Sequence, residues 1–234
     1  MARKRTTLVS EALEYIRKKI LSYELRPGQP ISDNKIALEM SEKLDLKISR
    51  SPVREAFMIL QAEGLVELID DKICVARITD RDVFEICQVR DAIEQQSVII
   101  AMENGGFTQE QKNRLSDIYR RLVEAKGQNS EAGEYLIDDE FHLYLVDCTG
   151  NKRLMEIASR MCTQMQRVRW LNMISPNRRQ EANSEHEEIL NAIIAGDQER
   201  AMQAIHTHNI NTQINFHRIF ESEELRKALV CLLD

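Results

Sequence analysis

The sequence predicts a mainly α-helical protein in two parts: three helices with a small β-hairpin, followed by an antiparallel bundle of about six helices. Only 8 glycines and 4 prolines occur in 234 residues, while 43% of the residues are hydrophobic and 30% are charged. That composition is typical of a folded, helix-rich protein. Apolar residues also recur with helical spacing between turn-forming residues. We expect residues 1–78 to form the first domain and residues 79–234 the second.

Two helices open the first domain. Apolar periodicity predicts the first over residues 8–23, and a Pro-Gly pair follows it. The second starts at Ser32 or Asp33, either of which is a suitable N-cap, and runs to Leu44.

The third helix carries the most informative residues of the chain. Ser51 is the expected N-cap, and Pro52 suits the first helical position because its missing N–H needs no partner there. The apolar stripe of this helix consists of Val53, Ala56, Phe57 and Leu60. Arg50 and Arg54 are then free at the N-terminal end, where an arginine can form two parallel hydrogen bonds with guanine. We therefore expect this helix to enter the major groove of DNA.

A hairpin completes the first domain. Residues 65–69 and 73–78 are rich in β-forming side chains and are separated by Asp70-Asp71-Lys72. Three helices followed by a hairpin make a winged helix-turn-helix. Residues 1–60 have a charge of +4 and the remainder −10, which indicates that only the first domain meets a polyanion. The alternative is a winged helix that contacts protein.

Three segments of this domain carry a family resemblance: Leu25-x-Pro27-Gly28, then Ser49 to Ala56, then Leu60-x-x-Glu63-Gly64-Leu65-Val66. Together they resemble the GntR family of bacterial transcription regulators over most of residues 8–78. The resemblance implies that Arg50 and Arg54, with Ser51 between them, contact operator DNA and that Lys35 contacts phosphate. Two departures stand out. Residues 38–48 are longer than the family usually has, and aspartates replace the usual glycine at the tip of the wing, where they would repel phosphate.

Six further helices are predicted in the second domain, at roughly residues 80–104, 108–126, 131–148, 152–174, 179–195 and 197–220. Short turns separate them, and Gly150 followed by Asn151 serves as a helix stop and the next N-cap. Such a bundle places ligand sites between facing helices.

Four polar residues fall on apolar helix faces of this bundle: Asp138, His142, His186 and His208. Burying them separately is costly, and convergence on a divalent cation would satisfy all four. One carboxylate and three imidazoles suit Zn²⁺, Ni²⁺ or Mn²⁺, with a coordination position left open. Each histidine could instead be a hydrogen-bonded core residue, and Asp139 could replace Asp138. His206 and His217 are expected at the surface or an interface.

The bundle also resembles a known domain. The series Asp138-x-x-x-His142, Glu185-His186-x-x-Ile189, Ala192-Ile193-x-x-Gly196-Asp197 and Ala201-x-x-Ala204-x-x-x-His208 is similar to the effector-binding FadR C-terminal domain of the FadR subgroup, over about residues 80–220.

In metal-binding members of that subgroup, matching residues hold a metal that meets the carboxylate of a small organic acid. The family often has an arginine at the position of Arg90, directed into the cavity, where it could bind an effector carboxylate. Arg90 could equally form a surface pair with Glu94. Arg167 and Arg169 are weaker candidates, because alternating residues cannot both face the core.

The cysteines and the hydropathy of the chain indicate the cellular compartment of the protein. Five scattered cysteines without a C-x-x-C motif fit a reducing cytosol. No signal peptide or membrane-length apolar run is evident. We therefore expect a cytoplasmic protein with no membrane partner.

We expect a repressor or dual regulator that binds double-stranded operator DNA, is controlled by an organic acid and is not an enzyme; the family resemblance implies that it is a homodimer. A metal-dependent hydrolase is the alternative, since an Asp/His₃ site can activate water. Leu190 stands where H-E-x-x-H needs its second histidine, however, and no G-x-S-x-G, P-loop or dinucleotide-binding loop occurs. A third possibility is an interaction module with a structural metal.

Overall fold

The structure, a computed structural model, describes residues 2–44, 47–127, 131–169 and 176–223. The chain divides into two compact units, Met1–Ile78 and Thr79–Asp234. The prediction of a mainly helical protein with one small hairpin is confirmed. In the described residues, no helix is long and apolar enough to cross a membrane.

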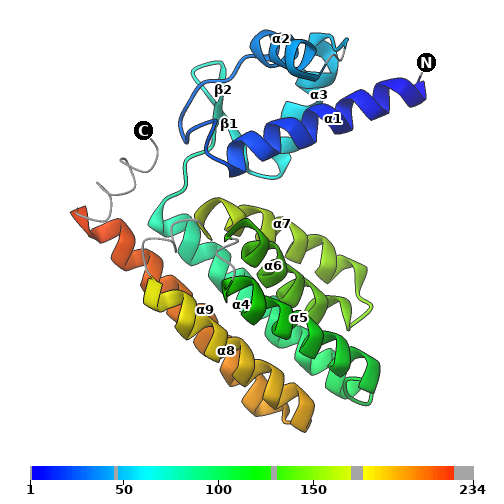
Figure 1. Cartoon of the computed structure of the whole chain (residues 1–234), viewed down its shortest axis with the longest axis vertical. Helices are drawn as coiled ribbons and strands as arrows, with labels where there is room; N and C mark the ends of the chain where they lie inside the picture. The colour runs from blue at the N-terminus through cyan, green and yellow to red at the C-terminus, as the bar shows by residue number, and fades with distance from the viewer. Residues whose placement is uncertain (1, 45–46, 128–130, 170–175, 224–234) are drawn as a thin grey trace. The chain divides into compact units, whose positions relative to one another are not determined.

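Three helices and a hairpin make up the first unit (Figure 1): α1 (Ala2–Leu21), α2 (Asp33–Leu44), α3 (Arg50–Ala62), β1 (Val66–Ile69) and β2 (Lys72–Val75). The strands pair antiparallel, with Val66 opposite Val75. Apolar residues from all three helices and the hairpin, such as Ile16, Met40 and Leu60, form one buried core. The apolar stripe of α3 packs into that core, and the opposite face of α3 is exposed to solvent.

The expected N-cap of α3 is wrong. The helix begins at Arg50, and its N-cap is Ser49, which has extended backbone angles (φ −90°, ψ 172°). Serine occupies both positions 49 and 51, so the local sequence does not distinguish them. Pro52 consequently occupies the third helical position, where its missing N–H is still one of the four that lack a partner within the helix.

The tip of the wing shows why it needs no glycine. Asp70 and Asp71 both have positive φ, 46° and 59°, and they form a two-residue turn between the paired residues Ile69 and Lys72. Positive φ at both central residues is the requirement of the tightest hairpin turns. Aspartate tolerates this conformation better than most residues because its short polar side chain can bond locally.

Six helices form the described part of the second unit (Figure 1): α4 (Asp80–Glu103), α5 (Gln109–Gly127), α6 (Glu131–Asp147), α7 (Lys152–Arg169), α8 (Pro176–Ala195) and α9 (Gln198–Glu221). Helix α4 packs against α6, α7 and α9, and α8 packs against α5 and α9. The predicted cap at Asn151 is confirmed, since its Oδ1 accepts hydrogen bonds from the N–H groups of Arg153 and Leu154. A capping box between Thr79 and Asp82 starts α4.

The interior of this bundle contains charged and polar side chains as well as apolar ones. Its apolar core includes Phe141, Leu145, Ile189 and Ile205, all with no exposed surface. Within the same bundle the structure buries charged and polar side chains, among them Arg90, Glu94, Arg178, His142, His186 and His208. Buried polar groups require partners. The contacts of these residues define a candidate site inside the second unit.

Candidate DNA interface and candidate metal centre

The exposed face at the start of α3 collects the predicted DNA-binding residues. Arg50, Ser51 and Arg54 are exposed on α3, and Lys35 is exposed on α2. The three α3 residues line one side of a groove of about 690 Å³, and residues of α2 line the other. A groove with exposed arginines at a helix N-terminus is suited to contact with nucleic acid.

Arg54 is held in place by α2. Its Nε donates a hydrogen bond to Oδ2 of Asp33, while 62% of the Arg54 side chain stays exposed. The contact occupies the Nε edge of the guanidinium. The two Nη groups therefore remain available for a pair of hydrogen bonds to a base edge.

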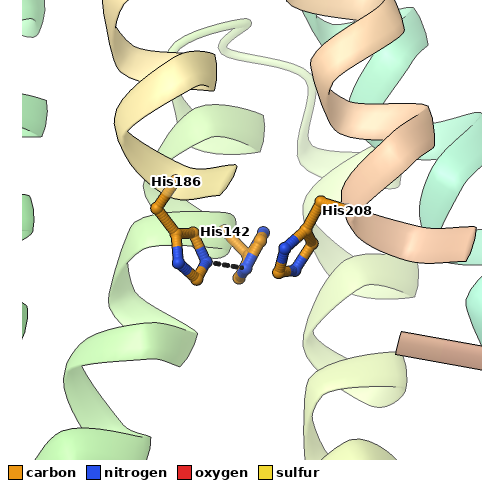
Figure 2. A group of neighbouring side chains, drawn as sticks. All are labelled: His142, His186 and His208. Atoms are coloured by element: carbon orange, nitrogen blue, oxygen red, sulfur yellow. Dashed lines mark hydrogen bonds between the residues drawn. The ribbon is translucent and has the colours of Figure 1, made fainter. Parts of the chain in front are cut away.

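Three histidines meet inside the second unit. Figure 2 shows His142, His186 and His208 with their rings directed toward one another, and they come from α6, α8 and α9. One ring nitrogen of each lies within 4.8 Å of the others, and all three side chains are buried. The Nε2 atoms of His142 and His186 are 2.9 Å apart. The structure thus brings together the three histidines that the sequence placed on inward helix faces.

The structure also separates the two neighbouring aspartates of α6. Asp138 Oδ1 lies 3.3 Å from His186 Nε2 and 4.0 Å from His142 Nε2. Asp139 Oδ2 instead accepts a hydrogen bond of 2.6 Å from Gln166 on α7. Asp138 is therefore the aspartate beside the histidines.

Arg90 forms the expected pair with Glu94, but the pair is buried. Its Nε donates to Glu94 Oε1 over 2.7 Å, with both side chains at most 5% exposed. Arg90 Nη2 also lies 3.4 Å from His208 Nε2, and Glu94 Oε1 lies 3.0 Å from His142 Nδ1. Sequence reasoning considered Glu94 only as a surface partner of Arg90. Its i,i+4 spacing was the available signal, but spacing does not tell a buried pair from an exposed one.

Arg178, which is buried, and Glu185, which is partly buried, form a second pair that the sequence did not reveal. Two hydrogen bonds of 2.7 Å join the Arg178 guanidinium to the Glu185 carboxylate. Glu185 Oε2 lies 2.8 Å from His208 Nδ1, and Asn211 donates to its Oε1. The predicted helix started at residue 179, which left Arg178 outside it.

Burial and pairing set the charges of this cluster. Burial lowers the pKa of His186 well below its ordinary value and lowers that of His208 to about 4, although Glu185 opposes the latter change. Burial alone would raise the carboxylate pKa values. His208 and Arg178 nevertheless lower the pKa of Glu185 to about 2, and Arg90 and His142 hold that of Glu94 far below its usual range. At neutral pH, His186 and His208 are therefore uncharged and both glutamates are ionised.

This donor set fits a divalent metal ion. Metal ligation requires neutral imidazoles and ionised carboxylates, and three histidines with one aspartate is a recognised combination for zinc and similar ions. The three histidines could hold such an ion, with Asp138 beside them as a further candidate ligand.

The other predicted residues lie apart from this centre. His206 and His217 are exposed, and their Nδ1 atoms lie 2.8 Å from Asp91 and Asp80, respectively. Arg167 is buried, while the side chain of Arg169 lies outside the described residues. Beside Arg90, Glu94 and His142 is a cavity of about 10 Å³, closed on its far side by residues of α7, which is room for about one water molecule.

A winged helix-turn-helix with exposed arginines, joined to an all-helical domain with a buried polar centre, is the arrangement of a DNA-binding transcription regulator. Comparison with known families agrees. Residues 8–72 match the model described as bacterial regulatory proteins, gntR family, and residues 85–211 match the FCD domain. The chain belongs to the GntR family of transcription regulators and carries an FCD domain, the FadR C-terminal type.

Individual relatives are regulators as well. The chain is 29% identical over 221 residues to the HTH-type transcriptional regulator LutR of Bacillus subtilis (strain 168), covering 85% of this chain and 96% of the relative. It is 27% identical over 212 residues to a probable D-xylose utilization operon transcriptional repressor of Paenarthrobacter nicotinovorans, covering 88% and 87%.

Among solved structures, a putative transcriptional regulator GntR from Rhodococcus sp. RHA1 superposes with a TM-score of 0.70. It covers 88% of this chain and 96% of its own, at 22% identity, so this likeness concerns the fold. The family and its relatives are transcription regulators and not enzymes, which leaves the hydrolase alternative without support.

Proposed function

We propose that this regulator is a repressor whose affinity for operator DNA is controlled by a small organic acid. The acid would bind at a divalent ion, Zn²⁺, Ni²⁺ or Mn²⁺, held by Asp138, His142, His186 and His208. The observation that carries the proposal is the convergence of three buried imidazoles and a carboxylate inside an FCD domain. A relative named as an operon repressor supports the sign of regulation.

DNA binding would divide between two kinds of contact. Arg50, Ser51 and Arg54 are exposed at the start of α3 and would read base edges in the major groove, whereas Lys35 would contact phosphate and position the helix. A homodimer would place two such helices on a pseudo-palindromic operator, with half-sites one helical turn apart. The protein would then act in the bacterial cytoplasm, where the chromosome lies.

The proposed effector site combines the bound divalent metal ion with the positively charged guanidinium of Arg90. A divalent ion in this donor set would offer an open coordination position to a carboxylate oxygen. Arg90 lies 3.4 Å from His208 Nε2, which places its guanidinium within reach of a second acidic group at the centre. We therefore expect monocarboxylates and dicarboxylates to be the class of effector.

The small cavity supplies a physical link between effector and DNA. A cavity of about 10 Å³ is far below the roughly 300–1,000 Å³ of common ligand pockets. An organic acid could enter this cavity if α7 separated from α4 and α6, since these helices line it. Such a separation would be the conformational change that alters DNA affinity. The effector can change DNA affinity only by as much as its own affinity differs between the two conformations. A difference of about 1.4 kcal/mol would change DNA affinity tenfold.

The test combines metal analysis with effector screening. We expect His186→Ala to lose stoichiometric metal while the helical content stays, and the control His206→Ala, an exposed histidine of the same unit, to keep it. Thermal-shift measurements with a panel of carboxylates should show stabilisation that a chelator abolishes. The same acids should release DNA of the protein's own upstream region. Unchanged metal in His186→Ala, or DNA retention with every acid, would overturn the proposal.

A further inference from the structure

The hydrogen on the His142 ring can be placed from its neighbours. His142 Nδ1 lies 3.0 Å from Glu94 Oε1, an ion-pair distance that does not meet hydrogen-bond geometry in this structure, and an ionised carboxylate can only accept a hydrogen bond. Arg90, which donates to the same oxygen over 2.7 Å, keeps that carboxylate ionised. In the neutral ring, this carboxylate favours the hydrogen of His142 on Nδ1, which leaves the lone pair of Nε2 facing the other two histidines.

His208 is constrained to the same tautomer from both sides of its ring. Nδ1 lies 2.8 Å from the Glu185 carboxylate, which Arg178 holds by two hydrogen bonds. Nε2 lies 3.4 Å from Arg90 Nη2, and a guanidinium can only donate. Both contacts require the hydrogen on Nδ1 and the lone pair on Nε2.

His186 has the opposite surroundings. Its Nε2 faces two acceptors, His142 Nε2 at 2.9 Å and Asp138 Oδ1 at 3.3 Å. Its Nδ1 is buried without a hydrogen-bond partner among the described residues. Among the three rings, His186 therefore carries its hydrogen on Nε2 and has no carboxylate behind it.

We propose that Glu94 and Glu185 are positioning residues for the metal centre: each fixes one imidazole, His142 or His208, in the tautomer whose Nε2 lone pair points at the ion, while His186 is left to change its tautomer on binding. The inference deepens the proposed function and rests on its metal site. A carboxylate behind a ligating imidazole orients the ring and raises its basicity. Arg90 and Arg178 serve this arrangement by holding the two glutamates.

The tautomers are measured first, on the metal-free wild-type protein, by long-range ¹H–¹⁵N correlation spectra of the histidine rings. We expect hydrogen on Nδ1 for His142 and His208 and on Nε2 for His186. Addition of Zn²⁺ alone should move the hydrogen of His186 to Nδ1 and leave the other two rings as they were. Hydrogen on Nε2 of His142 or His208 in the metal-free protein would overturn the proposal, whether or not any variant folds.

Metal affinity is measured next, by competition with a chromogenic chelator for Zn²⁺. Loss of a positioning carboxylate commonly weakens metal binding by about 10- to 100-fold, and we expect this for both Glu94→Gln and Glu185→Gln. Each variant should also show mixed tautomers at its own histidine, which a general loss of stability would not produce. Circular dichroism checks that both variants stay helical.

The chain offers a matched control for each variant. Glu85 lies on α4 and forms an i,i+4 pair with Arg81, as Glu94 does with Arg90, but the pair is exposed. Glu188 lies on α8 and accepts two hydrogen bonds from Arg200, as Glu185 does from Arg178, and is likewise exposed. We expect Glu85→Gln and Glu188→Gln to leave tautomers and Zn²⁺ affinity unchanged.

The two readouts separate this inference from the proposed function. A wild-type protein that binds no Zn²⁺ would overturn the metal site, and the positioning role with it. Tight Zn²⁺ binding that is equal in wild type, Glu94→Gln and Glu185→Gln would overturn the positioning role alone. Weakening in the two variants but not in their controls, with the expected tautomers, supports both.

Discussion

Replacement of Arg54 by lysine tests whether α3 reads DNA sequence. The substitution keeps the positive charge, so the attraction to phosphate is retained, but it removes the planar fork that can form two hydrogen bonds with guanine. Because 62% of the Arg54 side chain is exposed and its partner Asp33 lies on the neighbouring helix, the change removes little core packing. We therefore expect a change in DNA recognition and not in folding.

The size of the effect follows from the lost base contact. A bidentate contact is worth roughly 1–3 kcal/mol of discrimination, which corresponds to about a 5- to 150-fold loss of specific affinity for each half-site. Affinity for unrelated DNA depends on charge, which Arg54→Lys conserves, so it should stay within about a factor of two, and the slope of log K against log salt should be unchanged.

Fluorescence anisotropy can measure both affinities, with a fragment of the protein's upstream DNA and a scrambled fragment of equal length, at several salt concentrations. Arg81→Lys is the matched control, since Arg81 is also an exposed arginine in an ion pair but lies on α4. It should change neither affinity. An equal loss on the two fragments for Arg54→Lys would refute a base-reading role and leave Arg54 as a phosphate contact.

Two further predictions concern the first unit. Replacing Asp70-Asp71 with Asn-Gly should raise the free energy of unfolding by up to about 1 kcal/mol, since both residues have positive φ; denaturant unfolding with no gain, or with a loss, would contradict this account of the turn. Hydrogen bonds from Lys19 and Lys43 lower the pKa of Glu39 from 4.5 to about 2, so its contribution, at most about 3 kcal/mol, is complete above pH 4.5 and is lost as the pH falls to 2. Glu39→Gln should therefore be less stable at pH 7 and show a flatter acid denaturation curve than wild type, and curves of equal slope would rule this out.

Local sequence was sufficient for the elements and for the inward faces of the histidines. Helical periodicity and turn residues depend on neighbours within a few positions, so the order of helices and the hairpin followed from them. The same spacing put His142, His186 and His208 on buried faces, where the structure has them. Local sequence fails where two neighbouring positions offer the same signal. Serine occurs at both 49 and 51, and the sequence alone selected the wrong one as the N-cap of α3.

The tertiary structure alone decided which side chains meet. Asp138 and Asp139 are adjacent in the sequence, which does not tell them apart. Only the structure shows that Asp139 accepts a hydrogen bond from Gln166 on α7, which leaves Asp138 beside the histidines.

Glu185 reaches His208 across 23 positions of sequence, a contact that no periodicity encodes because it depends on how α8 and α9 pack. The sequence by itself therefore determined a helix with exposed arginines at its N-terminus and three inward-facing imidazoles. Packing between helices determined that two of those imidazoles lie against ionised glutamates, since contacts are fixed by distance in space and not by distance along the chain.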